Sequence, residues 1–221
     1  MRRLLIAVLL ALMGAAAARA DPPMCRNGDF PASNPAPGLA KVVGEGRLYF
    51  QNDIGDCPGA AAACRQRAYV VTGNVVLTGQ TVGTYVCAFF PNHDDGSAGY
   101  VEAARLASQP VAPAPPLAAW VGHWANGDDT IDLKAKGAAL SVVGNACWPS
   151  CHVSLKEAPG GPNVGDLSGT AAPKGRTVVF TDNDPTGCTA TLTMVGDVLS
   201  VFDNGGCGGQ NVTFTGVYMR K

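Results

Sequence analysis

The sequence predicts an essentially all-β protein made of two small units, each of which is stabilised by its own disulfides. Short apolar stretches alternate with polar residues and are interrupted by Gly, Asn or Pro, and no segment shows a convincing helical period of 3.6 residues. The eight cysteines fall four on each side of residue 110, where a proline-rich stretch lies. These three observations favour two separately stapled β-domains.

Residues 1–20 have the pattern of a secretory signal peptide. Arg2 and Arg3 form a basic start, an apolar run follows, and Ala18-Arg19-Ala20 gives the small-x-small ending. The apolar run is short for a retained anchor, and no other segment approaches 18 apolar residues. We therefore expect cleavage before Asp21, no membrane span, and a periplasmic or secreted protein in which an even number of cysteines forms disulfides.

The net charge of the chain limits the classes of partner that we expect. Loss of residues 1–20 removes three arginines and changes the formal net charge from −1 to about −4. Binding to a phosphate backbone requires a basic face, so we do not expect a nucleic-acid partner. A mildly acidic surface is compatible with a cationic protein partner.

Proline content marks the expected boundaries along the chain. Residues 21–40 contain five prolines and few apolar side chains, which predicts a disordered leader tied down at Cys25. Residues 107–116 contain four prolines and no charge, which predicts a semi-rigid polyproline linker. The two folded domains are then expected over residues 41–106 and 117–221.

The first domain is predicted to be a small, partly open β-barrel. Gly and Asn punctuate the segment at Thr72-Gly73-Asn74, over residues 79–83 and over residues 92–96. Between these turns we expect five short strands, at Gly46–Gln51, Arg67–Val71, Val75–Thr78, Thr84–Phe90 and Ala98–Val101.

This segment resembles a bacterial SH3-type domain over about residues 41–106. Gly73-Asn74, Phe89-Phe90, Gly99-Tyr100-Val101 and Leu106 occupy the places of that family's turn, aromatic pair and closing strand. Tyr100 stands where Trp is commoner, and residues 56–64 form an insertion. The resemblance implies an SH3-like barrel with an aromatic groove, for which the candidates are Tyr49, Tyr69, Tyr85, Phe89 and Tyr100. At these spacings the same side chains are equally good core residues.

The second domain alternates more regularly and predicts an antiparallel up-and-down β-barrel. Ile131 and Leu133 oppose polar neighbours, Ala190, Leu192 and Met194 alternate with threonines, and Val212, Phe214 and Tyr218 do the same near the end of the chain. Gly196 is placed to supply the positive φ of a tight hairpin turn between residues 194 and 198.

Each cysteine is assigned to a disulfide. The hairpin at Gly196 brings the strand that holds Cys188 beside the strand that ends at Asp203, which places Cys188 near Cys207. Cys57 and Cys64 close a short loop, Cys147 and Cys151 flank a possible Pro149-Ser150 turn, and Cys25 with Cys87 follows by elimination. Two alternatives stay open: a zinc site with Cys147, Cys151 and His152, and an anion-binding nest in the glycine-rich loop 203–209.

The second domain is also similar to an uncharacterised proteobacterial periplasmic family. The residues that carry the similarity are Trp120-Val121-Gly122-His123-Trp124, Leu199–Phe202 and the ending DNGGCGGQNVTFTGVY. Members of that family join an SH3-type domain to a small C-terminal β domain. A similar ending occurs near periplasmic proteins described as lysozyme-inhibitor-like.

Catalytic constellations are sparse. There is no Gly-x-Ser-x-Gly elbow, and the assigned disulfides leave no cysteine as a nucleophile. The three histidines are His93, His123 and His152, and turn formation accounts for the Asp-rich segments 92–95, 126–129 and 182–184. We therefore expect no catalytic residues, no metal and no cofactor.

The function predicted by elimination is that of a non-enzymatic periplasmic binding protein that engages cell-wall material or an envelope protein. Its expected partner is peptidoglycan or a periplasmic protein. The alternatives are an inhibitor of lysozyme-type muramidases, suggested by the acidic charge and the ending, and a metal-dependent hydrolase using His123, His152 and the Asp-rich turns.

Overall fold

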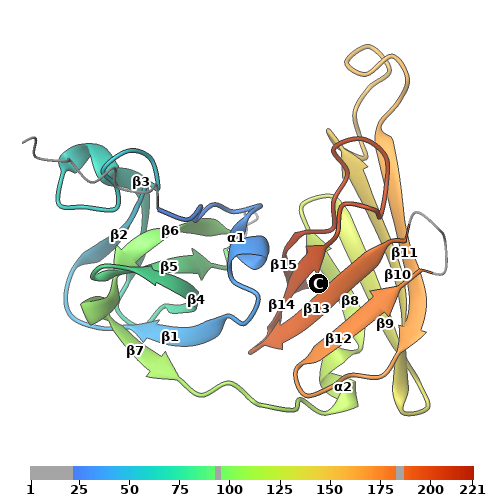
Figure 1. The fold of residues 1–221 in the computed structure, drawn as a ribbon, viewed down its shortest axis with the longest axis horizontal. Helices are drawn as coiled ribbons and strands as arrows, with labels where there is room; N and C mark the ends of the chain where they lie inside the picture. The colour runs from blue at the N-terminus through green and yellow to red at the C-terminus, as the bar shows by residue number, and fades with distance from the viewer. Residues whose placement is uncertain (1–21, 93–95, 183–186) are drawn as a thin grey trace, which may run out of the picture.

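The computed structural model describes residues 22–92, 96–182 and 187–221. These residues form strands in two antiparallel sheets, with helical segments of only three or four residues (Figure 1). The helical segments are α1 (Phe30–Ser33), η1 (Ala62–Cys64), η2 (Ala103–Arg105) and α2 (Leu117–Trp120). The all-β prediction is therefore confirmed.

The N-terminal sheet has seven strands in the order β3-β2-β6-β5-β4-β1-β7. Each strand contributes at least one apolar side chain to the same core, from Ala40 and Val42 on the first strand to Leu106 on the last. The sheet therefore curls around a common interior. The strands are β1 (Gly38–Val42), β2 (Arg47–Gln51), β3 (Arg65–Val71), β4 (Val75–Val82), β5 (Tyr85–Phe90), β6 (Ser97–Glu102) and β7 (Leu106–Gln109).

The five expected strands of this domain correspond to β2–β6, but β1 and β7 were not expected. β1 pairs with both β4 and β7, so it lies inside the sheet although it includes the end of the predicted leader. Most of β7 lies in the predicted linker. The prolines of the predicted leader all precede residue 38, and those of the predicted linker all follow residue 109. The proline content of each whole segment therefore does not indicate the proline-free strand at the end next to the domain.

The rest of the predicted leader is also structured. Phe30 on α1 is fully buried, Cys25 is bonded to Cys87, and Asn34 is buried. The expectation of a disordered segment over 21–40 is therefore wrong for the described residues 22–40. Its composition is proline-rich, but one aromatic anchor and one disulfide are sufficient to fix it on the sheet.

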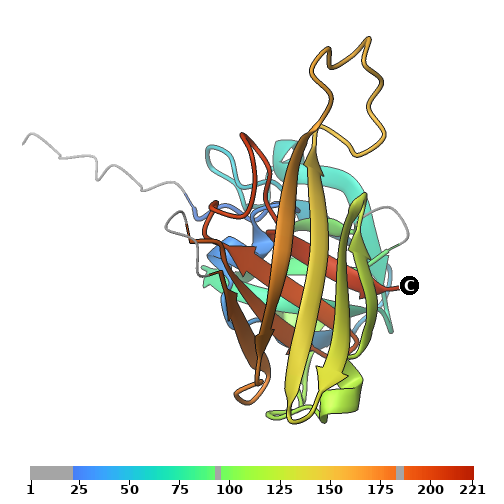
Figure 2. The same ribbon diagram turned by 90° about the vertical axis from the view of Figure 1, so that its right-hand side faces the viewer.

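The C-terminal sheet has the order β11-β10-β9-β8-β15-β14-β13-β12. Strands that follow each other in the sequence are neighbours in the sheet, except for β11 and β12, and the first strand, β8, pairs with the last, β15. β11 and β12 face each other across the remaining gap. The sheet is therefore a nearly closed up-and-down barrel, as predicted. Figure 2 shows the loop between β10 and β11 extending beyond one end of the barrel. The strands are β8 (Gly122–Asn126), β9 (Asp129–Lys136), β10 (Ala139–Trp148), β11 (Asn163–Ala171), β12 (Thr177–Thr181), β13 (Thr189–Val195), β14 (Val198–Asp203) and β15 (Gly216–Arg220).

Large side chains fill the barrel interior. Trp120, Trp124, Phe180 and Phe214 are fully or almost fully buried in one cluster, to which each of the eight strands contributes at least one apolar side chain. The indole N–H of Trp124 donates to the carbonyl of Trp120 at 2.9 Å. This interior is a packed core of the kind that small barrels form.

A shared apolar layer joins the two sheets. Leu77, Phe89 and Tyr100 lie on the face of β4–β6 that points away from the N-terminal core, and they form one cluster with Val195 and Val217 of the barrel. Helix α1 lies between the two sheets (Figure 1). β5 is therefore covered on both faces, which explains the continuous apolar run Tyr85–Phe90.

No helix in the described part of the chain is long and apolar enough to cross a bilayer.

Candidate functional site

All eight cysteines form disulfides: Cys25–Cys87, Cys57–Cys64, Cys147–Cys151 and Cys188–Cys207. These are the pairs expected from the sequence. The pairing removes the thiolates that a zinc site at Cys147 and Cys151 would require.

Hydrogen bonds hold the glycine-rich loop 203–209 in place, and its surroundings do not favour an anion. The buried Asp203 carboxylate accepts hydrogen bonds from the hydroxyls of Thr213 and Thr215 at 2.6 and 2.8 Å and from the Phe214 N–H at 3.1 Å. Asp166 and Asp182 line the hollow beside the loop. A phosphate would meet two carboxylates there, which opposes the anion nest.

The same hydrogen bonds correct one expectation about the last strand. The alternation from Asn211 suggested a strand from that residue, yet β15 begins at Gly216. Val212 and Phe214 are buried as the alternation requires, but Thr213 and Phe214 bond to Asp203 instead of joining the ladder.

The histidines of the hydrolase alternative lie on the surface, as far as they are described. Nδ1 of His123 is 3.0 Å from Oδ1 of Asp132, and both side chains are nearly half exposed. Nε2 of His152 is 3.9 Å from Oδ1 of Asp128. His93 lies outside the described residues, and among the residues described no group of three or more His, Cys, Asp or Glu side chains is placed to hold a metal ion.

The five aromatic residues proposed for a groove do not line one surface. Phe89 and Tyr100 are buried in the layer between the two sheets, and Tyr85 packs against that layer. The groove is therefore wrong as a single site. The physical reason is that the barrel and α1 cover the outer face of β5 and β6, a face that an isolated small barrel would leave exposed.

Tyr49 and Tyr69 remain, and they form an exposed surface with two arginines. They face each other across β2 and β3 with ring centroids 5.6 Å apart. The guanidinium of Arg47 lies 4.4 Å from the Tyr69 ring centre, and that of Arg65 lies 4.6 Å from the Tyr49 ring centre. We call Arg47, Tyr49, Arg65 and Tyr69 the Arg–Tyr surface.

This surface carries positive charge without close carboxylate partners. Among the described residues, no carboxylate oxygen lies within 4.0 Å of a guanidinium nitrogen of Arg47, Arg65 or Arg67. A hollow of about 160 Å³ beside the surface is lined by three arginines and one acidic residue, together with Leu48, Tyr49 and Gln51; its charged members are Arg47, Arg65, Arg105 and Glu102. The arrangement is suited to an anionic group that uses the guanidinium N–H donors left free by stacking.

The hydroxyl of Tyr49 is part of the same arrangement. Nη1 of Arg47 is 3.5 Å from the Tyr49 hydroxyl oxygen, to which it donates. That hydrogen bond, together with the charges of Arg47 and Arg65, lowers the pKa of the Tyr49 hydroxyl from its ordinary value. The hydrogen bond from Arg47 and the two positive charges outweigh the partial burial of the ring, which by itself raises the pKa.

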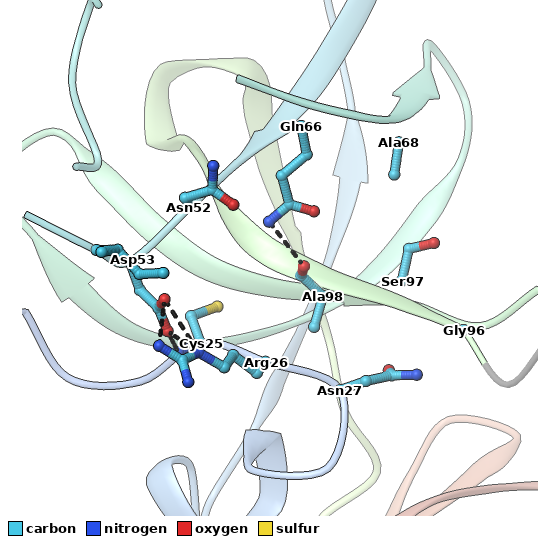
Figure 3. A pocket seen from close by; sticks show the side chains of 11 residues that line it. Cys25, Arg26, Asn27, Asn52, Asp53, Gln66, Ala68, Gly96, Ser97 and Ala98 are labelled. Carbon is cyan, nitrogen blue, oxygen red and sulfur yellow. Dashed lines mark hydrogen bonds and ion pairs between the residues drawn. The ribbon is translucent and has the colours of Figure 1, made fainter. Parts of the chain in front are cut away.

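A pocket of about 560 Å³ lies on the inner side of β3, where β2 has ended (Figure 3). Gln66 and Ala68 of β3 form one wall, Gly96–Ala98 form the floor, and residues 25–27 with 52–54 close the end. The Gln66 side-chain amide donates to the carbonyls of Gln51 and Ala98 at 3.1 and 3.4 Å, bridging β3 to β6.

Asp53 and Arg26 form the ion pair at the end of this pocket. Arg26 donates from Nε and Nη2 to the carboxylate at 3.0–3.1 Å, and the backbone N–H of Cys25 donates at 2.9 Å. The Asp53 side chain is 4% exposed and that of Arg26 is 50% exposed. Burial alone raises the pKa of Asp53, but the hydrogen bonds and the charge of Arg26 outweigh burial, so the pKa lies below its ordinary value.

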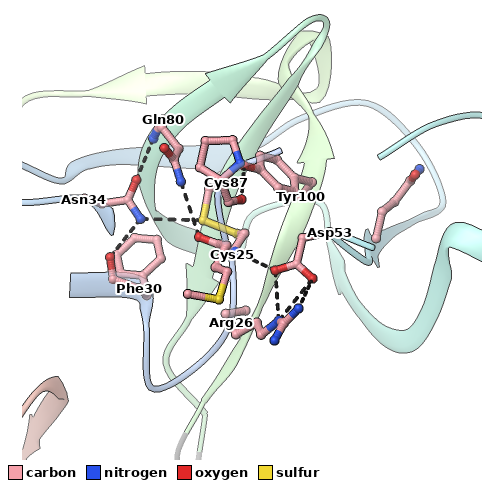
Figure 4. Close-up of a disulfide and its surroundings, with 12 residues drawn as sticks. Cys25, Arg26, Phe30, Asn34, Asp53, Gln80, Cys87 and Tyr100 are labelled. Carbon is pink, nitrogen blue, oxygen red and sulfur yellow. Dashed lines mark hydrogen bonds and ion pairs between the residues drawn. A yellow bond between two sulfur atoms is a disulfide. The ribbon is translucent and has the colours of Figure 1, made fainter. Parts of the chain in front are cut away.

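The Cys25–Cys87 disulfide holds this end of the pocket in place (Figure 4). The Tyr100 hydroxyl donates to the carbonyl of Pro23 at 2.7 Å. Asn34 donates to the carbonyl of Phe30 at 2.8 Å and accepts from the Gln80 N–H at 2.6 Å. A Cβ at residue 79 would lie 1.7 Å from Oδ1 of Asn34, which explains a glycine inside β4.

No protein-family model, no curated protein and no solved structure matches this chain. The site is therefore interpreted from its own geometry.

Sequence reasoning missed Arg47, Arg65 and Arg67 as surface residues of the site, and Arg26 and Asp53 as its support. A signal was present for β3, because RQRAYVV places Arg65, Arg67 and Tyr69 on one face of a strand. The stacking of Arg47 on Tyr69 depends on the register between β2 and β3, which has an irregularity between Tyr49 and Gln51. No local pattern specifies that register.

Proposed function

We propose that the protein is a non-enzymatic binding protein of the bacterial envelope, which engages cell-wall material or an envelope protein through the Arg–Tyr surface. The observation that carries this proposal is the exposed pair of stacked arginines, Arg47 and Arg65, with no carboxylate partner among the described residues. The four disulfides and the signal-peptide pattern support an exported location.

The chemistry of the surface favours a ligand that carries carboxylates. A guanidinium stacked on an aromatic ring retains its in-plane N–H donors, and these match a carboxylate in geometry. Peptidoglycan stem peptides and acidic protein segments both present such groups. The exposed tyrosine edges add apolar contact with a sugar ring or an aliphatic side chain.

The test compares the intact exported protein with R47Q/R65Q in sedimentation with purified sacculi and in pull-down from an envelope extract. We expect wild type to be retained in at least one arm, with retention decreasing as salt increases, and the variant to lose at least fivefold of it. The matched control is K134Q/K136Q, which removes the same charge from exposed positions on β9 of the barrel. Equal retention of wild type and R47Q/R65Q, or no retention in either arm, would contradict the proposal.

A second candidate is inhibition of a lysozyme-type muramidase. Asp128 and Asp129 line a polar hollow of about 360 Å³ near the Cys147–Cys151 turn, at the end of the barrel from which the β10–β11 loop extends (Figure 2). An acidic hollow at this end of the barrel is suited to a cationic side chain of an enzyme. A lytic assay with wild type and D128N tests this candidate; an unchanged lytic rate with added wild-type protein removes it.

A further inference from the structure

The inference concerns the free edge of β3. This seven-residue strand is at the end of its sheet and has β2 as its one hydrogen-bonded neighbour. β7, at the other end, has four residues and is followed by Pro110, which cannot donate to a ladder. The end strands of the barrel face each other across its seam. In the described residues, β3 is therefore the longest edge available to another strand.

The two faces of β3 differ in chemistry. Arg65, Arg67, Tyr69 and Val71 alternate on the exposed face, next to Arg47 and Tyr49 of β2. Gln66 and Ala68 point the other way and form a wall of the 560 Å³ pocket (Figure 3). A strand that paired with β3 would place alternate side chains against arginine and over a polar, small-residue pocket.

Charge opposes pairing with a second copy of the chain. Antiparallel pairing of β3 with itself places Arg65 and Arg67 opposite or diagonal to the same arginines of the other copy, and like charges at those positions are destabilising. The same arginines attract a strand with carboxylates at every second position. The edge therefore discriminates between partners by charge.

We propose that an extended, acidic segment of a partner protein adds to β3 as an eighth strand of the N-terminal sheet. Its acidic side chains pair with Arg65 and Arg67, and its alternate side chains lie over Gln66 and Ala68. The backbone ladder supplies affinity and the arginines supply selection, as in other cases of strand addition. This inference rests on the proposed function, because it names a protein segment as the ligand of the surface to which the Arg–Tyr residues belong.

The test uses two synthetic peptides with the same length and charge, acetyl-(Glu-Val)4-amide and its analogue with an N-methyl group on every residue, added to the 15N-labelled full-length exported protein. N-methylation removes the backbone N–H donors on both edges of the peptide, so only the first peptide can donate to a ladder with β3. We expect chemical-shift changes and slower amide exchange over residues 65–71 with the Glu-Val peptide, and at least tenfold weaker binding of the N-methylated peptide. R65Q/R67Q should weaken Glu-Val binding at least tenfold, whereas K134Q/K136Q should not change it.

The outcomes separate this inference from the proposed function. Equal affinity of the two peptides would overturn strand addition and leave charge-based binding by the surface intact. Retention on sacculi without binding of either peptide would also overturn it, because the ligand would then be cell-wall material. A loss of Glu-Val binding in K134Q/K136Q equal to that in R65Q/R67Q would show that the edge is not the site.

Discussion

Among the described residues, the N-terminal sheet and the barrel each bury one aspartate, and the two carboxylates differ in the groups that they contact. The Asp203 carboxylate in the barrel accepts hydrogen bonds from Thr213, Phe214 and Thr215, which are neutral groups of its own loop. Asp53 in the N-terminal sheet pairs with the half-exposed Arg26 at the end of an open pocket. The Asp203 carboxylate is satisfied within its own loop, whereas the N-terminal sheet leaves an edge, a pocket and stacked arginines facing solvent.

The two units are nevertheless not independent. The outer face of β4–β6 packs on β13–β15 and on α1, so each sheet covers apolar surface of the other. Shared burial of this kind couples the stabilities of the two units. The barrel therefore covers a face of β4–β6 that an isolated sheet would expose to solvent.

Of the changes predicted for the two units, removal of the Cys25–Cys87 disulfide should lower the stability of the protein the most. Its half-cystines are 62 positions apart, against 19 for Cys188–Cys207, so the chain-entropy model gives losses of about 4 and about 3 kcal/mol respectively. We expect C25A/C87A to unfold at lower urea than C188A/C207A. Circular dichroism of the whole chain measures both transitions.

Tryptophan fluorescence provides the check on coupling. All three tryptophans, Trp120, Trp124 and Trp148, lie in the C-terminal unit. If the shared apolar layer couples the units, the fluorescence transition of C25A/C87A moves together with its circular dichroism transition. A fluorescence transition identical to wild type would instead show that the barrel unfolds alone.

Replacement of Asp53 should have a smaller effect on stability, and this effect should depend on pH. The pKa of this carboxyl is lower in the folded protein than in the unfolded chain, so its contribution to stability is present above the unfolded pKa of about 3.9. That contribution is lost as pH falls through the folded pKa. D53N should therefore be less stable than wild type at pH 6, by about 1–2 kcal/mol for a charged hydrogen-bonded pair, and this difference should decrease as the pH falls below about 3.9.

Urea unfolding of wild type and D53N from pH 3 to pH 7 measures this decrease. D197N is the control, because Asp197 is exposed in the Gly196 hairpin turn. A stability difference between wild type and D53N that stays constant over the whole range would contradict the assigned ion pair.

The sequence allowed prediction of those elements whose evidence is local. The strands β2–β6 follow from alternation and turn residues, and the Cys188–Cys207 disulfide follows from the hairpin at Gly196. The burial of Phe89 and Tyr100 could not be predicted in this way, because it depends on the barrel packing against the sheet. The Arg–Tyr surface likewise depends on the register between β2 and β3, which is irregular between Tyr49 and Gln51 and which no local pattern specifies.

The smallest expected effect has the opposite sign, and it concerns a buried polar group on the barrel side of the comparison. The Tyr218 hydroxyl is buried and has no hydrogen-bond partner among the described residues, and burial raises its pKa above the ordinary value. Removing an unsatisfied buried hydroxyl is neutral or favourable, so Y218F should gain up to about 1 kcal/mol in urea unfolding at pH 7. A loss of 1 kcal/mol or more would mean that the hydroxyl bonds to a group in the interior, and that the barrel, like the N-terminal sheet, retains a polar site.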